Sequence, residues 1–429
     1  MGKGIVLRET TALLYSFTCV FMPMIGYRYY TINNELAALW VRYMPISEKD
    51  YMSFALPAIG CFCLAITWPL ARKNSPDERA ALEGFIDRIR RGINRKVGIT
   101  IMIIGLSISL AIPYLPGGLQ FFASLFFFGS FAGLLFLYYS PSFGYKKWIM
   151  TAFALFIFSN AINSGMFTIV AYMSVTIFSF FLLKSRASLF KKLGIVAIAF
   201  IFVIVLQNAK LAYRKSTWWS NYQGNRTELF ANLFFENLKK GDALFETDAF
   251  YPVYARTNQG YNVALVMKRI PAIQQFDHGE NLLKVAASSV VPRFLWPDKP
   301  EAGGRFNMEF YAGYQIRGFS TNIGPLGEAY GNFGVTGGIV YMFFLGLFIR
   351  WVYGRVFVLA KRNPFVICWL PVLFFQTVYS AEADTLQILN SLIKAAFFLW
   401  LLKKIFPTWF GIFKSRTVIR RRQMVESPA

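Results

Sequence analysis

Long apolar stretches alternate with short polar ones over most of this 429-residue chain. Most of the apolar stretches run for about 17–22 residues, which at 1.5 Å per residue crosses a hydrocarbon core of about 30 Å. The pattern predicts ten membrane-spanning helices, at about 11–30, 51–70, 98–114, 119–139, 148–162, 164–183, 193–207, 335–350, 364–380 and 385–402. We therefore expect an all-α polytopic membrane protein, and a single soluble domain is excluded.

The longest interruption of this pattern is a segment of mixed polarity at 208–334. Within it, the spacing of apolar residues predicts a helix from Thr227, as its cap, to Lys240, and a second over Gly260–Arg269 that stops before Pro271. Residues 290–305, rich in proline and glycine, are expected to be irregular. The chain divides into spans one to seven at 1–207, the large loop at 208–334, spans eight to ten at 335–404, and a basic tail at 405–429.

The formal charge of +23 invites a nucleic-acid interpretation, but the positions of the basic residues argue against one. Lys and Arg cluster in alternate loops, as the positive-inside rule requires, and these loops mark the cytoplasmic face. This assignment places both termini inside and the 208–334 loop outside. Charges of both signs are nearly balanced in that loop, which fits a segment outside the membrane. We expect membrane lipid as a partner, and no nucleic acid.

Soluble nucleotide-binding motifs are absent, since there is no P-loop, no dinucleotide fingerprint and no GxSxG elbow. The four cysteines lie in predicted spans, so no disulfide framework is expected. Three Glu-x-Asp pairs, at Glu48/Asp50, Glu246/Asp248 and Glu382/Asp384, arise easily by chance, and Asp384 is the expected cap of the last span. We therefore expect no metal and no cofactor.

The chemistry of the outer loop points to an anionic, sugar-bearing ligand. Guanidinium and ammonium groups bind phosphate, and aromatic faces bind sugar rings or line membrane interfaces. The candidate ligand-binding residues are Arg214, Arg256, Arg293, Lys299, Arg317, Trp296 and Tyr330. For any single Arg, a surface ion pair is the alternative interpretation.

Two carboxylates are candidates for acid–base chemistry. Glu328 lies among Gly, Tyr330 and Asn332, where partial burial would favour a working base, although a carboxylate there also stabilises a helix N-terminus. Asp298 is the second candidate, with a role in the proline-rich turn as the alternative. The single histidine, His278, is either a base or a turn residue.

These residues stand in a pattern that resembles the Wzy-type oligosaccharide repeat-unit polymerases of O-antigen, capsule and exopolysaccharide assembly. A weaker match is Lys210-Leu211-Ala212-Tyr213-Arg214. The main match consists of Pro292-Arg293, Trp296-Pro297-Asp298-Lys299-Pro300, Gly324-Pro325, Gly327-Glu328, Tyr330, Asn332-Phe333-Gly334 and Gly337.

The resemblance implies a multi-pass enzyme of the bacterial inner membrane, of the class C glycosyltransferase type, with its active site on the periplasmic side. Such an enzyme transfers a glycan from undecaprenyl pyrophosphate to an incoming lipid-linked repeat unit. On this interpretation Arg293, with Arg214 or Arg256, binds the pyrophosphate, and Glu328 or Asp298 accepts the proton of the acceptor hydroxyl. Partners implied by the family are a chain-length regulator and a flippase.

Two alternatives stay open. O-antigen ligases share the architecture, although their spaced His, Leu and Gly pattern is missing around His278. A lipid-linked oligosaccharide flippase belongs to another class, and it predicts paired half-repeats and charges along a central cavity. The sequence has no internal repeat, and its polar residues gather outside the spans.

Overall fold

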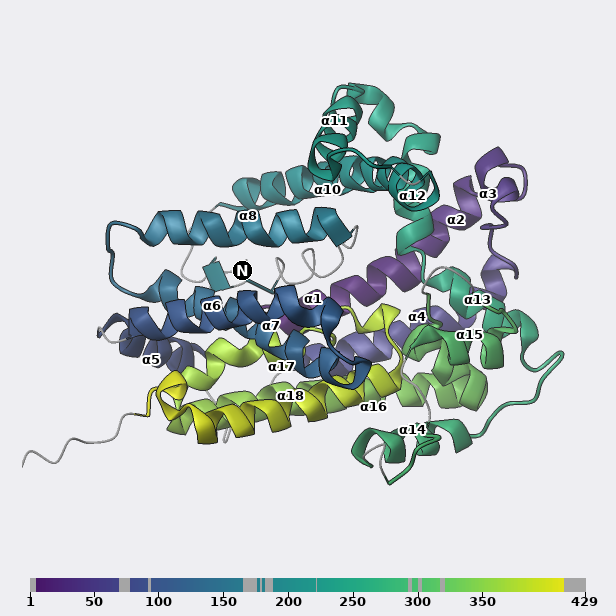
Figure 1. Cartoon of the computed structure of the whole chain (residues 1–429). Coiled ribbons are helices and arrows are strands. Elements are labelled where there is room, and N and C mark those ends of the chain that lie inside the picture. Colours follow the sequence, from purple (N-terminus) through teal and green to yellow (C-terminus); the bar gives the residue numbers. More distant parts are fainter. Residues whose placement is uncertain are drawn as a thin grey trace, which may run out of the picture.

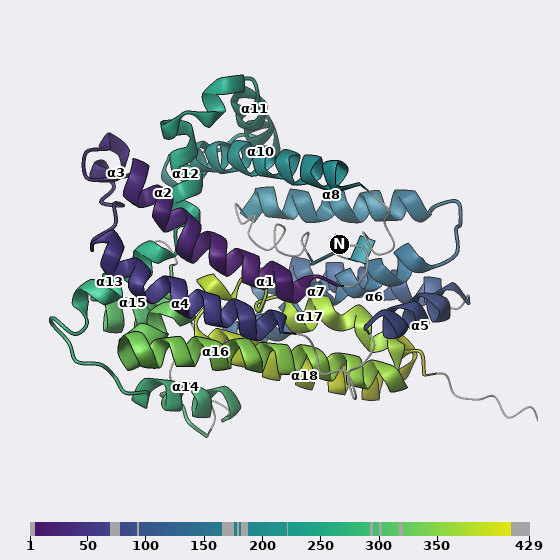
Figure 2. The ribbon, with the colours of Figure 1, turned by 180° about the vertical axis from the view of Figure 1, so that it is seen from behind.

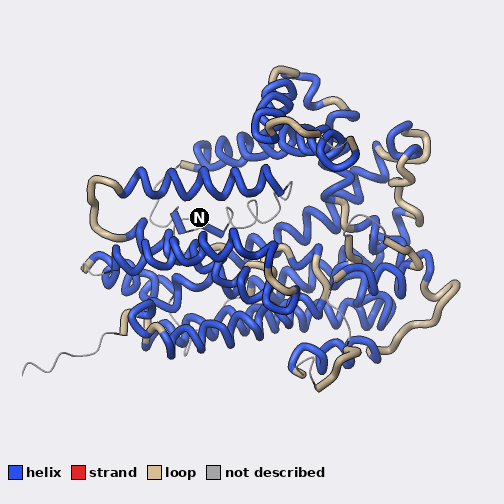
Figure 3. Tube along the Cα trace, in the orientation of Figure 1, coloured by secondary structure: helices blue, strands red, loops and turns tan. Residues whose placement is uncertain are grey.

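The computed structural model describes residues 5–68, 78–91, 94–164, 176–177, 180–181, 188–220, 222–291, 295–299, 303–316 and 321–412. Every regular element among these residues is a helix (Figure 3). The α-helices are α1 (Leu7–Ser16), α2 (Met22–Tyr29), α3 (Glu35–Leu39), α4 (Glu48–Thr67), α5 (Glu78–Arg90), α6 (Asn94–Ala111), α7 (Gly117–Tyr139), α8 (Lys146–Ser164), α10 (Leu189–Arg214), α11 (Arg226–Leu238), α12 (Thr247–Thr257), α13 (Gly260–Arg269), α14 (Glu280–Val290), α15 (Gly304–Ala312), α16 (Gly324–Arg362), α17 (Leu370–Phe374) and α18 (Thr385–Ile405). Short π and 3-10 turns are η1 (Phe17–Phe21), η2 (Ile112–Tyr114), η3 (Lys215–Trp219), η4 (Gly241–Phe245), η5 (Pro364–Trp369), η6 (Ser380–Glu382) and η7 (Pro407–Phe410).

The long helices run roughly side by side, and the short helices gather at their ends (Figures 1 and 2). Helices α3, α13 and α15 lie at one end of the molecule, whereas α5 lies at the opposite end. The chain of the large loop therefore folds back over one end of the bundle. This end carries the candidate chemistry.

Six helices in the described part of the chain are long and apolar enough to cross a membrane. They span Leu7–Tyr29, Glu48–Thr67, Lys96–Tyr114, Leu119–Tyr139, Gly324–Arg362 and Thr385–Ile405. These correspond to six of the ten predicted spans, so the chain has the character of a membrane protein. Helices α8 and α10 cover the predicted spans at 148–162 and 193–207. Most of the predicted span at 164–183 lies outside the described residues.

Two predicted boundaries differ from the structure. Helix α16 begins at Gly324 rather than 335, because the Gly-rich end of the loop is itself helical and buried. The predicted span at 364–380 is an apolar helix only over Pro364–Phe374, which is too short to cross a bilayer. Pro371 near the start of α17 and the polar residues from Gln376 onward oppose a longer helix.

Small residues let the long helices pack closely in pairs. A Cβ added at Gly346 of α16 would stand 2.8 Å from the Phe62 carbonyl oxygen of α4, and one at Gly105 of α6 would clash with the backbone of α7 at Phe126. A Cβ added at Gly338 of α16 would stand 2.8 Å from the ring of Phe54 in α4, so glycine leaves room for that ring. Helix α16 kinks at Gly334, whose φ of 65° favours glycine.

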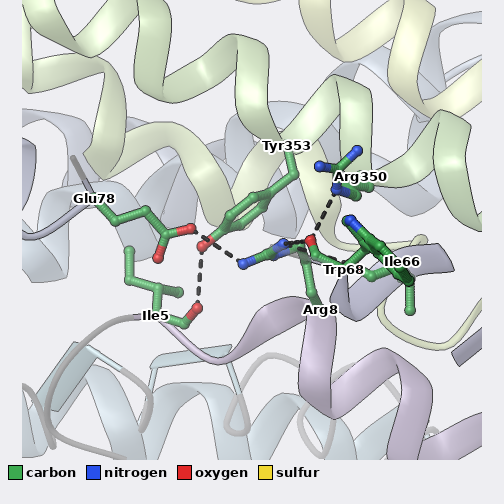
Figure 4. A network of polar contacts seen from close by, with 7 residues as sticks. All are labelled: Ile5, Arg8, Ile66, Trp68, Glu78, Arg350 and Tyr353. Carbon is green, nitrogen blue, oxygen red and sulfur yellow. Dashed lines mark hydrogen bonds and ion pairs between the residues drawn. The ribbon is translucent and has the colours of Figure 1, made fainter. Parts of the chain in front are cut away.

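A polar cluster around Arg8 joins four segments near the N-terminus (Figure 4). The Arg8 guanidinium pairs with Glu78 at 3.5 Å and lies 5.1 Å from the ring centroid of Tyr353. Arg350 donates to the Trp68 carbonyl at 2.9 Å, and the Tyr353 hydroxyl donates to the Ile5 carbonyl at 3.0 Å. These contacts connect α1, the end of α4, α5 and α16.

The helices predicted inside the large loop are present. Helix α13 covers Gly260–Arg269, as predicted. Helix α11 is also confirmed, but its cap is Asn225, whose side chain accepts from the backbone N–H groups of Thr227 and Glu228; the assignment of the cap to Thr227 is wrong. Asp384 caps α18 as predicted, in a capping box with Gln387.

Candidate functional site

A cavity of about 710 Å³ lies beside the C-terminal part of α10, where α3, α12 and α13 meet that helix. Its walls come from α3 and the residues after it, α10, α12, α13, α15 and the chain beyond α15. Segments that are far apart in the sequence thus enclose one space. That volume suits a ligand of the size of a small organic molecule or a sugar phosphate.

Cations dominate the charged groups of this cavity. Lys210 and Arg214 lie four residues apart on α10, so they share one helix face. Arg256 of α12 and Arg42, after α3, complete the set. Of the described residues that line the cavity, Asp248 alone carries a carboxylate, and it is exposed. The cavity therefore has an excess of positive charge, which favours an anionic ligand.

Lys210 is the most deeply buried of these cations, with 6% of its surface exposed. It lies three residues beyond the apolar stretch 193–207. Burial lowers the pKa of the Lys210 ammonium to about 7, and the charges of Arg214 and Arg256 act in the same direction, against a smaller opposite effect of Glu382. A buried ammonium beside two guanidinium groups is costly without an anion. A bound phosphate would stabilise the charged form of Lys210.

Arg256 is held by an ion pair at the edge of the cavity. Its guanidinium donates to a Glu382 carboxylate oxygen at 2.6 Å. Glu382 belongs to η6, two residues before the cap of α18. The pair thus links the cationic wall to the N-terminal end of α18.

Tyrosines supply the aromatic part of the site. Tyr251, Tyr261 and Tyr314 line the cavity, and the Arg42 guanidinium lies 4.8 Å from the Tyr261 ring centroid. Burial raises the pKa of Tyr251 to about 12, against an opposite effect of Arg42, so its hydroxyl is neutral at physiological pH. The wall therefore offers aromatic surface together with cations, which is the combination expected for a phosphorylated sugar.

A second polar cluster, around Glu328 and Asp384, is buried from solvent. Glu328 is 2% exposed, accepts from the Thr385 N–H at 2.9 Å and from the Asn307 amide at 3.1 Å, and also accepts the Thr385 hydroxyl proton. Asp384 accepts from the Gly303 N–H at 2.8 Å and from the Asn322 amide at 2.9 Å. Burial raises the pKa of Asp384, while hydrogen bonds from Gln387, Asn322 and Gly303 oppose the rise. In this arrangement both carboxylates hold the start of α18.

A short hydrogen-bonded path connects the two clusters. The Asn262 amide, on the cavity wall, donates to the Thr321 hydroxyl at 2.9 Å and to the Asn322 carbonyl at 2.8 Å. Asn322 in turn donates to Asp384. The cavity wall is thereby braced against the buried carboxylates.

The structure brings together some of the residues expected from the sequence. Arg214 and Arg256 share the cavity, whereas Arg293 and Arg317 lie outside the described residues. Among the rest, Glu328 is buried as described above, and Tyr330 packs between Phe54 and Phe276.

The Trp-Pro-Asp-Lys segment lies after α14, and none of its residues lines the cavity. Lys299 donates at 2.7 Å to the carbonyls of Ser288 and Val291, so it holds the end of α14. Trp296 accepts the Lys299 N–H through its carbonyl at 3.4 Å, and Asp298 is exposed. These contacts give the segment a structural role in the described chain.

Sequence reasoning passed over three cavity residues. Lys210 appeared only within a weaker motif, although its position directly after an apolar stretch and four residues before Arg214 is a usable signal. Asp248 was considered only as half of an acidic pair. Arg42 carries no local signal, because it reaches the cavity through tertiary packing alone.

Comparison with known families identifies the chain by its sequence. A family model described as a domain of unknown function (DUF8712) matches residues 88–358, more than half of the chain, so the protein belongs to this family. No curated protein and no solved structure matched the chain.

Proposed function

We propose that this member of the DUF8712 family is a membrane glycosyltransferase that acts as an oligosaccharide repeat-unit polymerase. It transfers a growing glycan from undecaprenyl pyrophosphate to an incoming lipid-linked repeat unit. The proposal rests on one observation: Arg42, Lys210, Arg214 and Arg256 surround one cavity in which Asp248 alone, among the described lining residues, is acidic.

The cationic wall suits a pyrophosphate leaving group. Guanidinium groups make paired, charge-assisted hydrogen bonds to phosphate oxygens, and a preorganised cation stabilises charge as it develops. Lys210 and Arg214 come from α10, and Arg256 comes from α12, so the cluster can approach a phosphate from two elements. No nucleotide-binding motif competes with this interpretation.

The reaction requires the acceptor hydroxyl to lose its proton. Its oxygen attacks the anomeric carbon of the donor sugar, the bond from that carbon to the pyrophosphate oxygen breaks, and the bonding electrons leave with the pyrophosphate. We assign proton acceptance to Asp248, because it is an exposed carboxylate on the wall of the same cavity. Tyr251, Tyr261 and Tyr314 supply surfaces for the sugar rings.

Glu328 is the second candidate for the base, as the sequence suggested. Its hydrogen bonds, from Thr385 and Asn307, lie inside the protein and favour a positioning role. Activity of Glu328→Gln distinguishes the two roles. If Glu328→Gln loses glycan transfer but keeps its thermal stability, Glu328 is the base. If the variant loses transfer and thermal stability together, Glu328 is a positioning residue.

The membrane setting completes the proposal. The charge pattern favours both termini in the cytoplasm and the cavity on the periplasmic side of a bacterial inner membrane. A chain-length regulator and a flippase are the partners that the family resemblance implies. Arg293 and Arg317 remain further candidates for the pyrophosphate site.

Electrophoresis of surface and lipid-linked glycan from a strain lacking the protein tests the proposal. Single-repeat glycan without a ladder is the expected result. Long polymer left on its lipid carrier would mean a ligase, and repeat units held on the cytoplasmic side would mean a flippase.

Complementation then tests the site. Arg256→Gln and Asp248→Asn should fail to restore the ladder, whereas Lys215→Gln, an exposed lysine beyond the end of α10, should restore it. Full activity of both site variants would refute the assignment of this cavity.

A further inference from the structure

The cavity has an apolar part that the reaction chemistry does not use. Leu36 and Trp40 contribute from α3 and the residue after it, and Leu211 contributes from α10. Trp40 is 59% exposed and Leu211 is 55% exposed, although both line the cavity. Large apolar side chains thus stand at the open side of a cationic pocket.

The segment that carries Trp40 is held in place by hydroxyl groups of two tyrosines. The Tyr261 hydroxyl donates to the Val41 carbonyl at 2.8 Å, and the Tyr254 hydroxyl donates to the Arg42 carbonyl at 3.1 Å. Val41 has a φ of 49°, which a β-branched residue rarely adopts. Backbone held in such a conformation often occurs at ligand-binding positions. These hydrogen bonds therefore fix the backbone that places Trp40 and Arg42 on the cavity wall.

The position of these residues along the chain places the apolar rim near the membrane boundary. The candidate span Leu7–Tyr29 ends seven residues before Leu36, and Leu211 follows the apolar stretch 193–207 by four residues. Tryptophan is enriched at the level where the hydrocarbon region meets the head groups. An apolar chain attached to a ligand in the cavity would reach lipid past this rim.

We propose that Leu36, Trp40 and Leu211 form the subsite for the apolar chain of a lipid-linked anion whose phosphate binds the cations of the same cavity. Lys210 and Leu211 are neighbours on α10, so a cationic contact and an apolar contact are provided by one turn of helix. This inference rests on the anion site of the proposed function and deepens it, because it assigns the residues that contact the apolar chain of a single-chain amphiphile with a phosphate head.

Titration of the purified protein in a maltoside detergent with inorganic phosphate and with butyl, hexyl and octyl phosphate tests the subsite. In the wild type, affinity should rise with chain length, by up to about fourfold for each buried methylene. The double variant Trp40→Ser/Leu211→Ser should bind inorganic phosphate like the wild type and lose most of the rise. Both side chains are more than half exposed, so their replacement spares the core.

Leu39→Ser is the matched control, because Leu39 is 72% exposed on the same segment and does not line the cavity. It should keep the wild-type dependence on chain length. An equal rise in all three proteins would mean partition into detergent and would overturn the subsite while leaving the anion site intact. Failure of the wild type to bind any phosphate would refute the anion site itself, and the subsite with it.

Discussion

Replacement of Lys210 by methionine should make the ligand-free protein more stable while it weakens anion binding. Methionine fills a similar volume without a charge, and Lys210 is 6% exposed beside two other cations. The substitution therefore removes a buried ammonium whose charged form the folded state disfavours. Stability and ligand binding should change in opposite directions, which an ordinary packing role would not produce.

The pKa of Lys210 sets the size and the pH range of the effect. The ordinary lysine pKa is 10.5, and that of folded Lys210 is about 7. Below about pH 7 both the folded and the unfolded chain hold the proton, so the full penalty is present. Between about pH 7 and 10 the unfolded chain binds more protons, so wild-type stability rises with pH. At about 1.4 kcal/mol per pKa unit, the upper limit is on the order of 5 kcal/mol.

Thermal unfolding of the ligand-free proteins from pH 6 to pH 10 measures this difference. We expect Lys210→Met to unfold at a higher temperature than the wild type near pH 7, and the gap to narrow as the pH rises. Lys215→Met, at an exposed lysine in η3, is the control and should follow the wild type. A Lys210→Met protein that is less stable at pH 7, or a gap that does not depend on pH, would refute this electrostatic reasoning.

Three further outcomes follow from the site. Inorganic pyrophosphate should bind the wild type more weakly as the pH rises above about 7, by up to tenfold per pH unit, because the bound anion favours the protonated form of Lys210; calorimetry should find weaker binding without this dependence in Lys210→Met. Glu382→Gln should strengthen pyrophosphate binding several-fold, since it frees the Arg256 guanidinium from a 2.6 Å ion pair, and unchanged or weaker binding would contradict this. Asn225→Ala should lower the free energy of unfolding by about 1 kcal/mol through loss of the α11 cap, whereas Thr227→Ala should cost less; equal effects in thermal melts would argue against the observed cap.

The local sequence pattern predicted correctly those helices whose ends are marked by a proline or by a capping side chain. Helix α13 agrees with its prediction because an amphipathic run stops just before Pro271, and Asp384 caps α18 because its side chain accepts from the following backbone. The start of α16 was missed, because a stretch rich in glycine has low helix propensity and is helical here through burial against other elements. The segment from 364 to 380 was assigned too great a length, because hydropathy does not show that the polar residues from Gln376 onward oppose a longer apolar helix.

The candidate site also has features that the sequence predicted and features that only the structure shows. Cations and aromatics of the large loop pointed to an anionic, sugar-bearing ligand, and Arg214 and Arg256 do share a cavity. Glu328 was predicted to be a site residue from its neighbours in the sequence. Its hydrogen-bond partners, Thr385 and Asn307, are far from it in sequence, so only the structure reveals that it accepts hydrogen bonds at the start of α18.

The sequence by itself therefore determined that this chain is helical, that it has the apolar lengths of a membrane protein, and that its polar chemistry gathers in the large loop. Those properties follow from hydropathy, period and charge, which act over a few turns of chain. Only the tertiary structure decided that Arg42, Lys210 and Arg256 line one cavity and that the exposed Trp40 lines it too. Such meetings depend on how the shapes of distant helices pack, through close contacts at residues such as Gly338 and Gly346, and no local pattern encodes which elements will become neighbours.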